Sequence, residues 1–156
     1  MEKQIRCASG VVLLALLFGG SAQGASLSTT EAALLEAVND VRLANGLQPL
    51  HVDETLVRAA RAHTSAMLRN DVLTHGSFGS RLGSFGARGP RFGENLAWGT
   101  GALASARVLV QAWLASPGHR ANLLRPGFRR IGIGARIGHF AGSRRATVVT
   151  ADFAGS

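Results

Sequence analysis

The sequence predicts an α+β domain in which helices pack on a small antiparallel sheet. After residue 25, apolar residues first recur at helical spacing, and alternation with a period of two appears only near the C-terminus. An order of helices first and strands last, within one short chain, favours helices that cover an antiparallel sheet. The chain has 156 residues, which is enough for one domain and too few for two.

Residues 1–25 have the composition of a secretory signal peptide. A basic N-terminus precedes an apolar run over 11–20, and small and polar residues follow that run. The run is shorter than the roughly 20 residues that a membrane span requires. We therefore expect cleavage before Ala25 or before Ser26. This leaves a single domain over 26–156, secreted or periplasmic and without a membrane span; the alternative is an uncleaved anchor.

Two long helices are expected at the start of this domain. Ser28 and Glu31 have the spacing of a capping box, and the apolar repeat behind them predicts a helix over 29–45. Asp53 is expected to cap a second helix over 54–70. The inner stripe of this second helix comprises Leu56, Ala60, His63 and Met67.

The middle of the chain is expected to hold a long loop and two shorter helices. Residues 76–93 are rich in glycine and show no periodicity, which is typical of a long loop that is functional or mobile. Thr100 is expected to cap a helix over 102–115 whose inward face includes Leu103. Ser116, followed by a proline, predicts the start of a short fourth helix.

Two strands are expected near the C-terminus. Residues 129–138 alternate in polarity and residues 146–153 are rich in β-branched side chains, so each is typical of a strand. The segment 138–145 between them predicts a hairpin loop. The connector over 47–53 is expected to add a short edge strand.

The expected mature domain carries a large net positive charge. From residue 26 onward there are fifteen arginines, no lysine and eight acidic residues, which gives a net charge of +7. A basic exported domain favours the anionic surfaces of a cell envelope as partners. No basic run has interleaved aromatic residues, which argues against nucleic acid as a partner. The only cysteine, Cys7, lies in the expected signal peptide, so the domain must be held by its core without disulfides.

Five histidines are the first candidates for chemistry. We expect His63 in the core with a satisfied hydrogen bond, and His51 and His139 on the surface. His75 and His119 are more informative, because each stands beside a glycine near the end of an expected helix.

His119 would be the third residue of the fourth helix, where the helix dipole disfavours an imidazolium and keeps the ring neutral. Glu94, in a glycine-flanked turn, would complete a His-His-Glu set with His75. Three such ligands can hold a divalent metal and leave positions open for water or substrate. The alternative is that the three groups only hydrogen-bond to one another and fix a loop.

Seven segments of the chain occur in an order that is specific for one family. They are "LLEAVNDVRLANGLQPL", "ETLVRAARAHTSAM", "THGS", "GENLAWG", "AWLASPGHRANLL", "RRIGIGA" and "VVTADFAG". This order resembles the CAP superfamily of cysteine-rich secretory, antigen 5 and pathogenesis-related proteins, and most of all its compact bacterial secreted branch with an SCP-like domain. The resemblance covers residues 31–155. It implies an α-β-α sandwich of about four helices around a small antiparallel sheet.

The resemblance also implies a cleft with two histidines and two acidic residues, which in several members bind zinc or another divalent cation. His75 and His119 match the histidines and Glu94 matches the first acidic residue, so these three are the tentative metal ligands. Ser116 stands where the second acidic residue is usual; it can cap a helix but is a poor ligand for a divalent metal. Asn122, one turn beyond His119, is expected to border the cleft.

We therefore expect an exported CAP-like domain that binds a ligand or partner through this cleft, with a weak divalent-metal site. Lipids, sterols and anionic envelope components are the candidate ligands. Exposed side chains of Phe78, Phe85 and Phe92 would favour an amphipathic ligand. One alternative is a metal-assisted hydrolase in which Glu94 is the general base, with no other catalytic residue assigned. The other is an interaction scaffold with a vestigial cleft.

Overall fold

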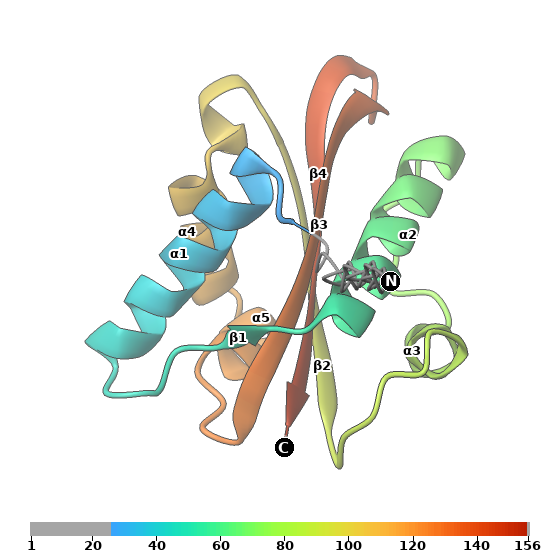
Figure 1. Ribbon diagram of the computed structural model, residues 1–156. Coiled ribbons are helices and arrows are strands. Elements are labelled where there is room, and N and C mark those ends of the chain that lie inside the picture. Colours follow the sequence, from blue (N-terminus) through green and yellow to red (C-terminus); the bar gives the residue numbers. More distant parts are fainter. Residues whose placement is uncertain (1–25, 156) are drawn as a thin grey trace, which may run out of the picture.

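A computed structural model describes residues 26–155 and has the α-β-α architecture that the resemblance implies (Figure 1). A four-stranded sheet forms the middle layer, with α1, α4 and α5 on one face and α2 and α3 on the other. In chain order the elements are α1 (Thr29–Ala44), β1 (His51–Val52), α2 (Glu54–Asn70), α3 (Phe78–Ser84), β2 (Phe92–Thr100), the 3-10 turn η1 (Gly101–Ala104), α4 (Ala106–Ala115), α5 (Pro117–Leu123), β3 (Phe128–Phe140) and β4 (Ser143–Gly155). The expected signal peptide and its cleavage site lie outside the described residues.

The two long helices begin where the sequence predicts. The hydroxyl of Ser28 accepts a hydrogen bond from the N–H of Glu31, whose carboxylate accepts one from the N–H of Ser28. This capping box begins α1. Asp53 begins α2 by accepting hydrogen bonds from two N–H groups of the first turn. The predicted inner stripe of α2 is buried at all four positions: Leu56, Ala60, His63 and Met67.

The sheet has the strand order β1-β3-β4-β2 and is mixed rather than purely antiparallel. β4 pairs antiparallel with both β3 and β2, whereas the short β1 runs parallel to β3. Parallel pairing is allowed here because α2 and all of the following elements up to α5 separate β1 from β3 in the chain. The predicted edge strand at 47–53 is therefore present as β1, and β2 forms the opposite edge.

Strand β2 is the main element that sequence patterning did not predict. We expected Glu94 in a turn, but Phe92–Thr100 is a continuous strand that pairs along its length with β4. The strand buries two polar residues in succession, Glu94 and Asn95. This hides the period-two alternation of apolar residues that normally reveals a strand.

The segment expected to be a long loop contains the short helix α3. Leu82 is buried, and the rings of Phe78 and Phe85 pack in the same cluster. Residues four and three apart lie on one side of a helix, so these three side chains attach α3 to the rest of the domain. With α3, residues 26–155 contain five α-helices, which agrees with the expectation of about four.

The helix expected over 102–115 begins later than predicted. Gly101–Ala104 forms a 3-10 turn, and α4 begins only after Ser105. Leu103, which we expected to face inward, is 64% exposed. The backbone of this turn, rather than the Leu103 side chain, lies against β2: a Cβ added at Gly99 would lie 2.4 Å from the carbonyl oxygen of Leu103.

The hairpin at the C-terminus is tighter than predicted. β3 and β4 extend across most of the expected loop at 138–145 and are joined at Ala141 and Gly142. Both residues have positive φ, 49° and 79° respectively, which is the pattern of a two-residue hairpin turn. The long hairpin leaves β4 as a central strand with a partner on each side.

Helix α2 packs unusually close to the sheet. A Cβ added at Gly132 would lie 2.0 Å from the backbone carbon of Leu56, and one at Gly134 would lie 2.5 Å from that of Ala60. Only glycine permits this approach. The "GIG" segment of β3 thus fixes the position of α2, which carries His63.

Candidate functional site

The candidate site lies at the edge of the sheet formed by β2. Successive side chains of a strand point to opposite faces, so Glu94 faces α2 and α3 while Asn95 faces α5. Both residues are buried, at 6% and 0% exposure. Side chains from the two helical layers can meet here because β2 is an edge strand of the sheet that residues 26–155 form.

His75 lies in the connection after α2 and is held by Glu94. Its Nδ1 lies 2.7 Å from Oε1 of Glu94, and the His75 side chain is 56% exposed whereas that of Glu94 is 2% exposed. An ionised carboxylate can only accept, so Nδ1 carries the hydrogen. In the neutral ring Nε2 then keeps its lone pair, which leaves that atom available for a ligand.

His119 is the third residue of α5 and approaches His75 from the other face of the sheet. The centroids of the two rings are 6.5 Å apart and the ring planes are inclined by 47°. Burial, and then the charge of His75, lower the pKa of His119, so its ring is neutral near pH 7. His75, Glu94 and His119 therefore lie together at the β2 edge.

Asp152 and Arg81 complete the charged cluster beside the histidines, and sequence reasoning missed both. Asp152 on β4 pairs in register with Glu94 and is fully buried. Nη2 of Arg81 on α3 donates to Glu94 and also lies 3.3 Å from Oδ1 of Asp152. Burial raises the pKa of Asp152 to about 8; Arg81 opposes this rise and Glu94 adds to it. Near neutral pH Asp152 therefore keeps most of its proton, and the guanidinium of Arg81 lies beside both side chains.

The sequence held a signal for Asp152 but none for Arg81. Asp152 is a lone carboxylate inside the apolar segment "VVTADFAG", and a charged group in a buried strand requires a partner. The position of Arg81 depends on α3, which shows no periodicity that could have located it. The contact between them was therefore not predictable from local sequence.

His63 is buried, at 8% exposure, as predicted. Its Nε2 donates to the carbonyl oxygen of Thr74 at 2.7 Å and lies 3.8 Å from Oε2 of Glu94. Burial, and then the charge of Arg81, lower the pKa of His63. Because Thr74 precedes His75, this hydrogen bond fixes the connection that presents His75.

Asn122 and Ser116 have structural contacts of different kinds. Nδ2 of Asn122 donates to the carbonyl oxygen of Glu94 at 3.1 Å and to Oδ1 of Asn95 at 3.0 Å, so it joins α5 to β2. Asn95 in turn donates to the carbonyl oxygen of His119 at 3.0 Å. Ser116 occupies the N-cap position of α5, but its hydroxyl makes no capping hydrogen bond, contrary to our expectation. Pro117 at the first helical position leaves one fewer unpaired N–H group at this end of α5.

The residues fit a two-imidazole site better than the expected three-ligand metal site. Within residues 26–155, no group of three or more His, Cys, Asp or Glu side chains is placed to hold an ion. Glu94 gives one oxygen to His75 and the other to Arg81, so it serves as a partner of an imidazole rather than as a ligand. The nitrogens of His75 and His119 are the donors that would hold a divalent cation, and two ligands hold one weakly.

Two further expectations find little support in the geometry. A general base must reach the proton that it removes, but the Glu94 side chain is 2% exposed and both of its oxygens have partners. Phe78, Phe85 and Phe92 are half-buried against the cluster around Leu82. These rings therefore anchor α3 rather than presenting an apolar surface to a ligand.

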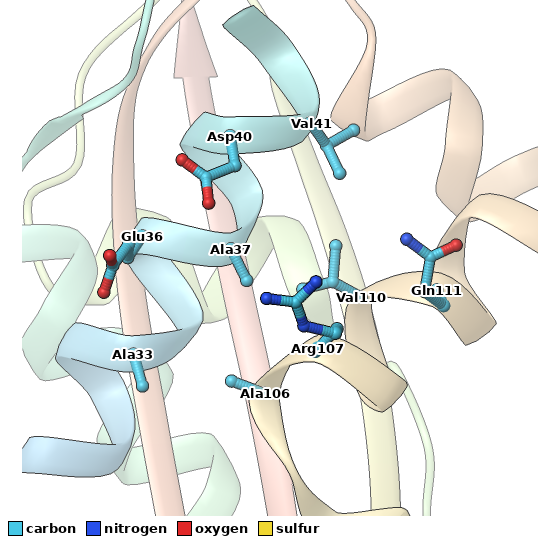
Figure 2. Close-up of a pocket in the computed structure, with 9 residues that line it drawn as sticks. All are labelled: Ala33, Glu36, Ala37, Asp40, Val41, Ala106, Arg107, Val110 and Gln111. Atoms are coloured by element: carbon cyan, nitrogen blue, oxygen red, sulfur yellow. The ribbon is translucent and has the colours of Figure 1, made fainter. Parts of the chain in front are cut away.

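A concave region lies between α1 and α4, and no histidine lines it (Figure 2). Its volume is about 260 Å³. Glu36 and Asp40 come from α1, and Arg107 and Gln111 come from α4. The complete lining is Ala33, Glu36, Ala37, Asp40, Val41, Ala106, Arg107, Val110 and Gln111.

Comparison with known sequences identifies relatives in Bacillus subtilis strain 168. The protein YkwD is 39% identical over 114 residues, which are 70% of this chain and 43% of YkwD. The membrane protein YlbC is 30% identical over 112 residues, which are 69% of this chain and 32% of YlbC. The chain thus spans less than half the length of these curated relatives.

Solved structures with the same fold come from several organisms. An extracellular protein of Bacillus anthracis that contains an SCP domain superposes with a TM-score of 0.69 at 25% identity, covering 81% of this chain and 40% of that one. An outer surface protein of Borrelia burgdorferi superposes with a TM-score of 0.67 at 24% identity, covering 85% of this chain and 99% of that one. No helix within residues 26–155 is both long and apolar enough to cross a bilayer.

The family assignment follows from sequence and fold together. The profile of the CAP, cysteine-rich secretory protein, family matches residues 35–153, which is most of the chain. The α-β-α sandwich and the SCP-domain structure from Bacillus anthracis agree with that match. The protein belongs to the CAP family.

Proposed function

We propose that this CAP domain is an exported binding module whose cleft holds a ligand between His75 and His119. The observation that carries the proposal is the arrangement of the two imidazoles. They reach the β2 edge from opposite faces of the sheet, with ring centroids 6.5 Å apart. Glu94 orients one ring, and burial keeps the other neutral near pH 7. Two such rings provide a nitrogen lone pair and N–H donors at one place.

The chemistry of the cleft suits a weakly held divalent cation or a polar group that hydrogen-bonds to imidazole. Zinc is the simplest probe, because imidazole nitrogen is among its preferred ligands. The net charge of +7 from residue 26 onward favours anionic partners. We therefore expect the polar group that binds the imidazoles to belong to an anionic component of the cell envelope. The extracellular and outer-surface descriptions of the two solved relatives support export.

The test is a calorimetric titration of the purified protein with zinc chloride. We expect weak binding, with a dissociation constant of tens of micromolar or more, because only two imidazoles coordinate the ion. The double variant His75→Ala/His119→Ala should lose this binding. The matched control is His51→Ala/His139→Ala, which also removes two histidines but leaves the cleft intact.

Binding that survives in the His75→Ala/His119→Ala variant, or that disappears equally in the control variant, would place the zinc site elsewhere and end the proposal. Both variants should first show the circular dichroism spectrum and melting temperature of the wild type. His75 and His119 are partly exposed, so replacing them should cost little stability.

A further inference from the structure

The carboxyl groups of Glu94 and Asp152 lie side by side near the histidines, and the guanidinium of Arg81 contacts both. Glu94 and Asp152 are directly paired across β2 and β4, with side chains that are 2% and 0% exposed. Two ionised carboxylates at such paired positions would repel each other. Arg81, whose side chain is 12% exposed, contacts both acids through Nη2. A buried positive charge therefore already occupies the position from which a cation could neutralise the two acids.

The contact between Arg81 and Asp152 leaves one polar atom of each side chain without a hydrogen bond. Nε of Arg81 and Oδ2 of Asp152 are buried without a hydrogen-bond partner in the described part of the chain. Nη1 of Arg81 donates to the carbonyl oxygen of His75 at 3.3 Å, which brings the charge next to the imidazole connection. In a bidentate arginine–carboxylate pair, two N–H groups of the guanidinium donate parallel hydrogen bonds to the two oxygens of one carboxylate. Arg81 instead shares one nitrogen between two acids, so its main contribution here is charge.

We propose that Arg81 is a built-in cation that determines the selectivity of the cleft, by occupying the carboxylates and repelling divalent ions from the neighbouring imidazoles. This inference rests on the proposed function of His75 and His119. Without Arg81, one positive charge would be gone and the carboxylate of Glu94 would be free to support a bound ion. The wild-type cleft would then favour uncharged or anionic groups over metal ions.

The test compares zinc affinity in variants of Arg81 by calorimetry. Arg81→Met removes the charge and keeps the approximate volume, and it should bind zinc at least about tenfold more tightly than the wild type. Arg81→Lys keeps the charge and should bind as weakly as the wild type. The control is Arg61→Met, which removes one arginine from a separate ion pair with buried Glu31 and should leave zinc affinity unchanged.

Removal of Arg81 alone could prevent folding, because it leaves buried acids without a partner. The double variant Arg81→Met/Asp152→Asn removes the guanidinium together with one acid, and it should also gain at least about tenfold in zinc affinity. A purely structural Arg81 would yield less stable variants with no gain. Unchanged or weaker zinc affinity in the folded Arg81→Met or double variant would overturn the inference.

The two proposals fail in different ways. The binding proposal is decided by the His75→Ala/His119→Ala variant in the wild-type background, whereas the role of Arg81 is decided by the gain in Arg81→Met. A cleft that loses zinc with its histidines but gains nothing without Arg81 would keep the first proposal and remove the second.

Discussion

At the scale of single residues, Glu31 shows how one carboxylate can join three elements. It closes the capping box of α1, accepts hydrogen bonds from Arg61 of α2 at 2.9 and 2.5 Å, and accepts one from the N–H of Ala135 in β3 at 3.3 Å. Burial alone would raise the pKa of Glu31, but the hydrogen bonds and charge of Arg61 and the N–H groups of Ser28 and Ala135 together lower it below 4.5. The ionised form therefore stabilises the fold.

This gives a prediction for the pH dependence of stability. Because the pKa of Glu31 is lower in the folded than in the unfolded chain, its stabilisation is fully present above pH 4.5 and is lost as the pH falls through the folded-state pKa. Glu31→Gln should lower the free energy of unfolding by about 2 kcal/mol at pH 7. Urea unfolding of both proteins from pH 7 to pH 2.5 measures this. A difference that stays constant at acidic pH would contradict the assignment.

Residues of the site that belong to a sequence motif could be predicted, and residues outside such motifs could not. His75, Glu94 and His119 stand in motifs that resemble the family, and His63 was predicted as buried from the stripe of α2 alone. Asp152 and Arg81 were not identified because their contact depends on strand register and on a helix without a sequence signature. Strand register and the position of α3 belong to the tertiary structure, which local sequence patterns do not predict.

At the scale of elements, the close contact between α2 and β3 positions the cleft. The glycines of β3 let the backbone of α2 approach the strand, and α2 carries His63, which fixes the connection bearing His75. Helices α1 and α2 were predicted because their caps and periodicity agree. Strand β2 was not predicted, because its buried polar residues serve the site and interrupt the alternation.

The glycine contact makes a direct prediction about stability. Gly132→Ala should destabilise the domain by about 3 kcal/mol or more, since the added Cβ would lie 2.0 Å from the backbone of Leu56 and force α2 away from the sheet. The matched control is Gly127→Ala, where the added Cβ meets nothing within 4 Å. Thermal unfolding of both variants measures the effect; equal melting temperatures would show that the helix moves without cost.

At the scale of the whole molecule, the α-β-α sandwich brings polar and charged side chains from both helical layers together at one edge of its sheet. The core on each face positions one helical layer, and the layers supply His119 from one side and His75 with Arg81 from the other. Neither layer alone contains all of these side chains. The proposed binding site therefore depends on how the two layers are placed, and Asn122 of α5 joins one layer to β2 through Asn95 and the carbonyl oxygen of Glu94.

Nitrogen NMR of the imidazole side chains during zinc addition tests most directly whether His75 and His119 share a ligand. We expect the resonances of His75 and His119 to shift together and those of His51 and His139 to stay in place, because only the first pair shares the β2 edge. Shifts of equal size at all of these histidines, or shifts confined to His51 and His139, would contradict a ligand site between His75 and His119.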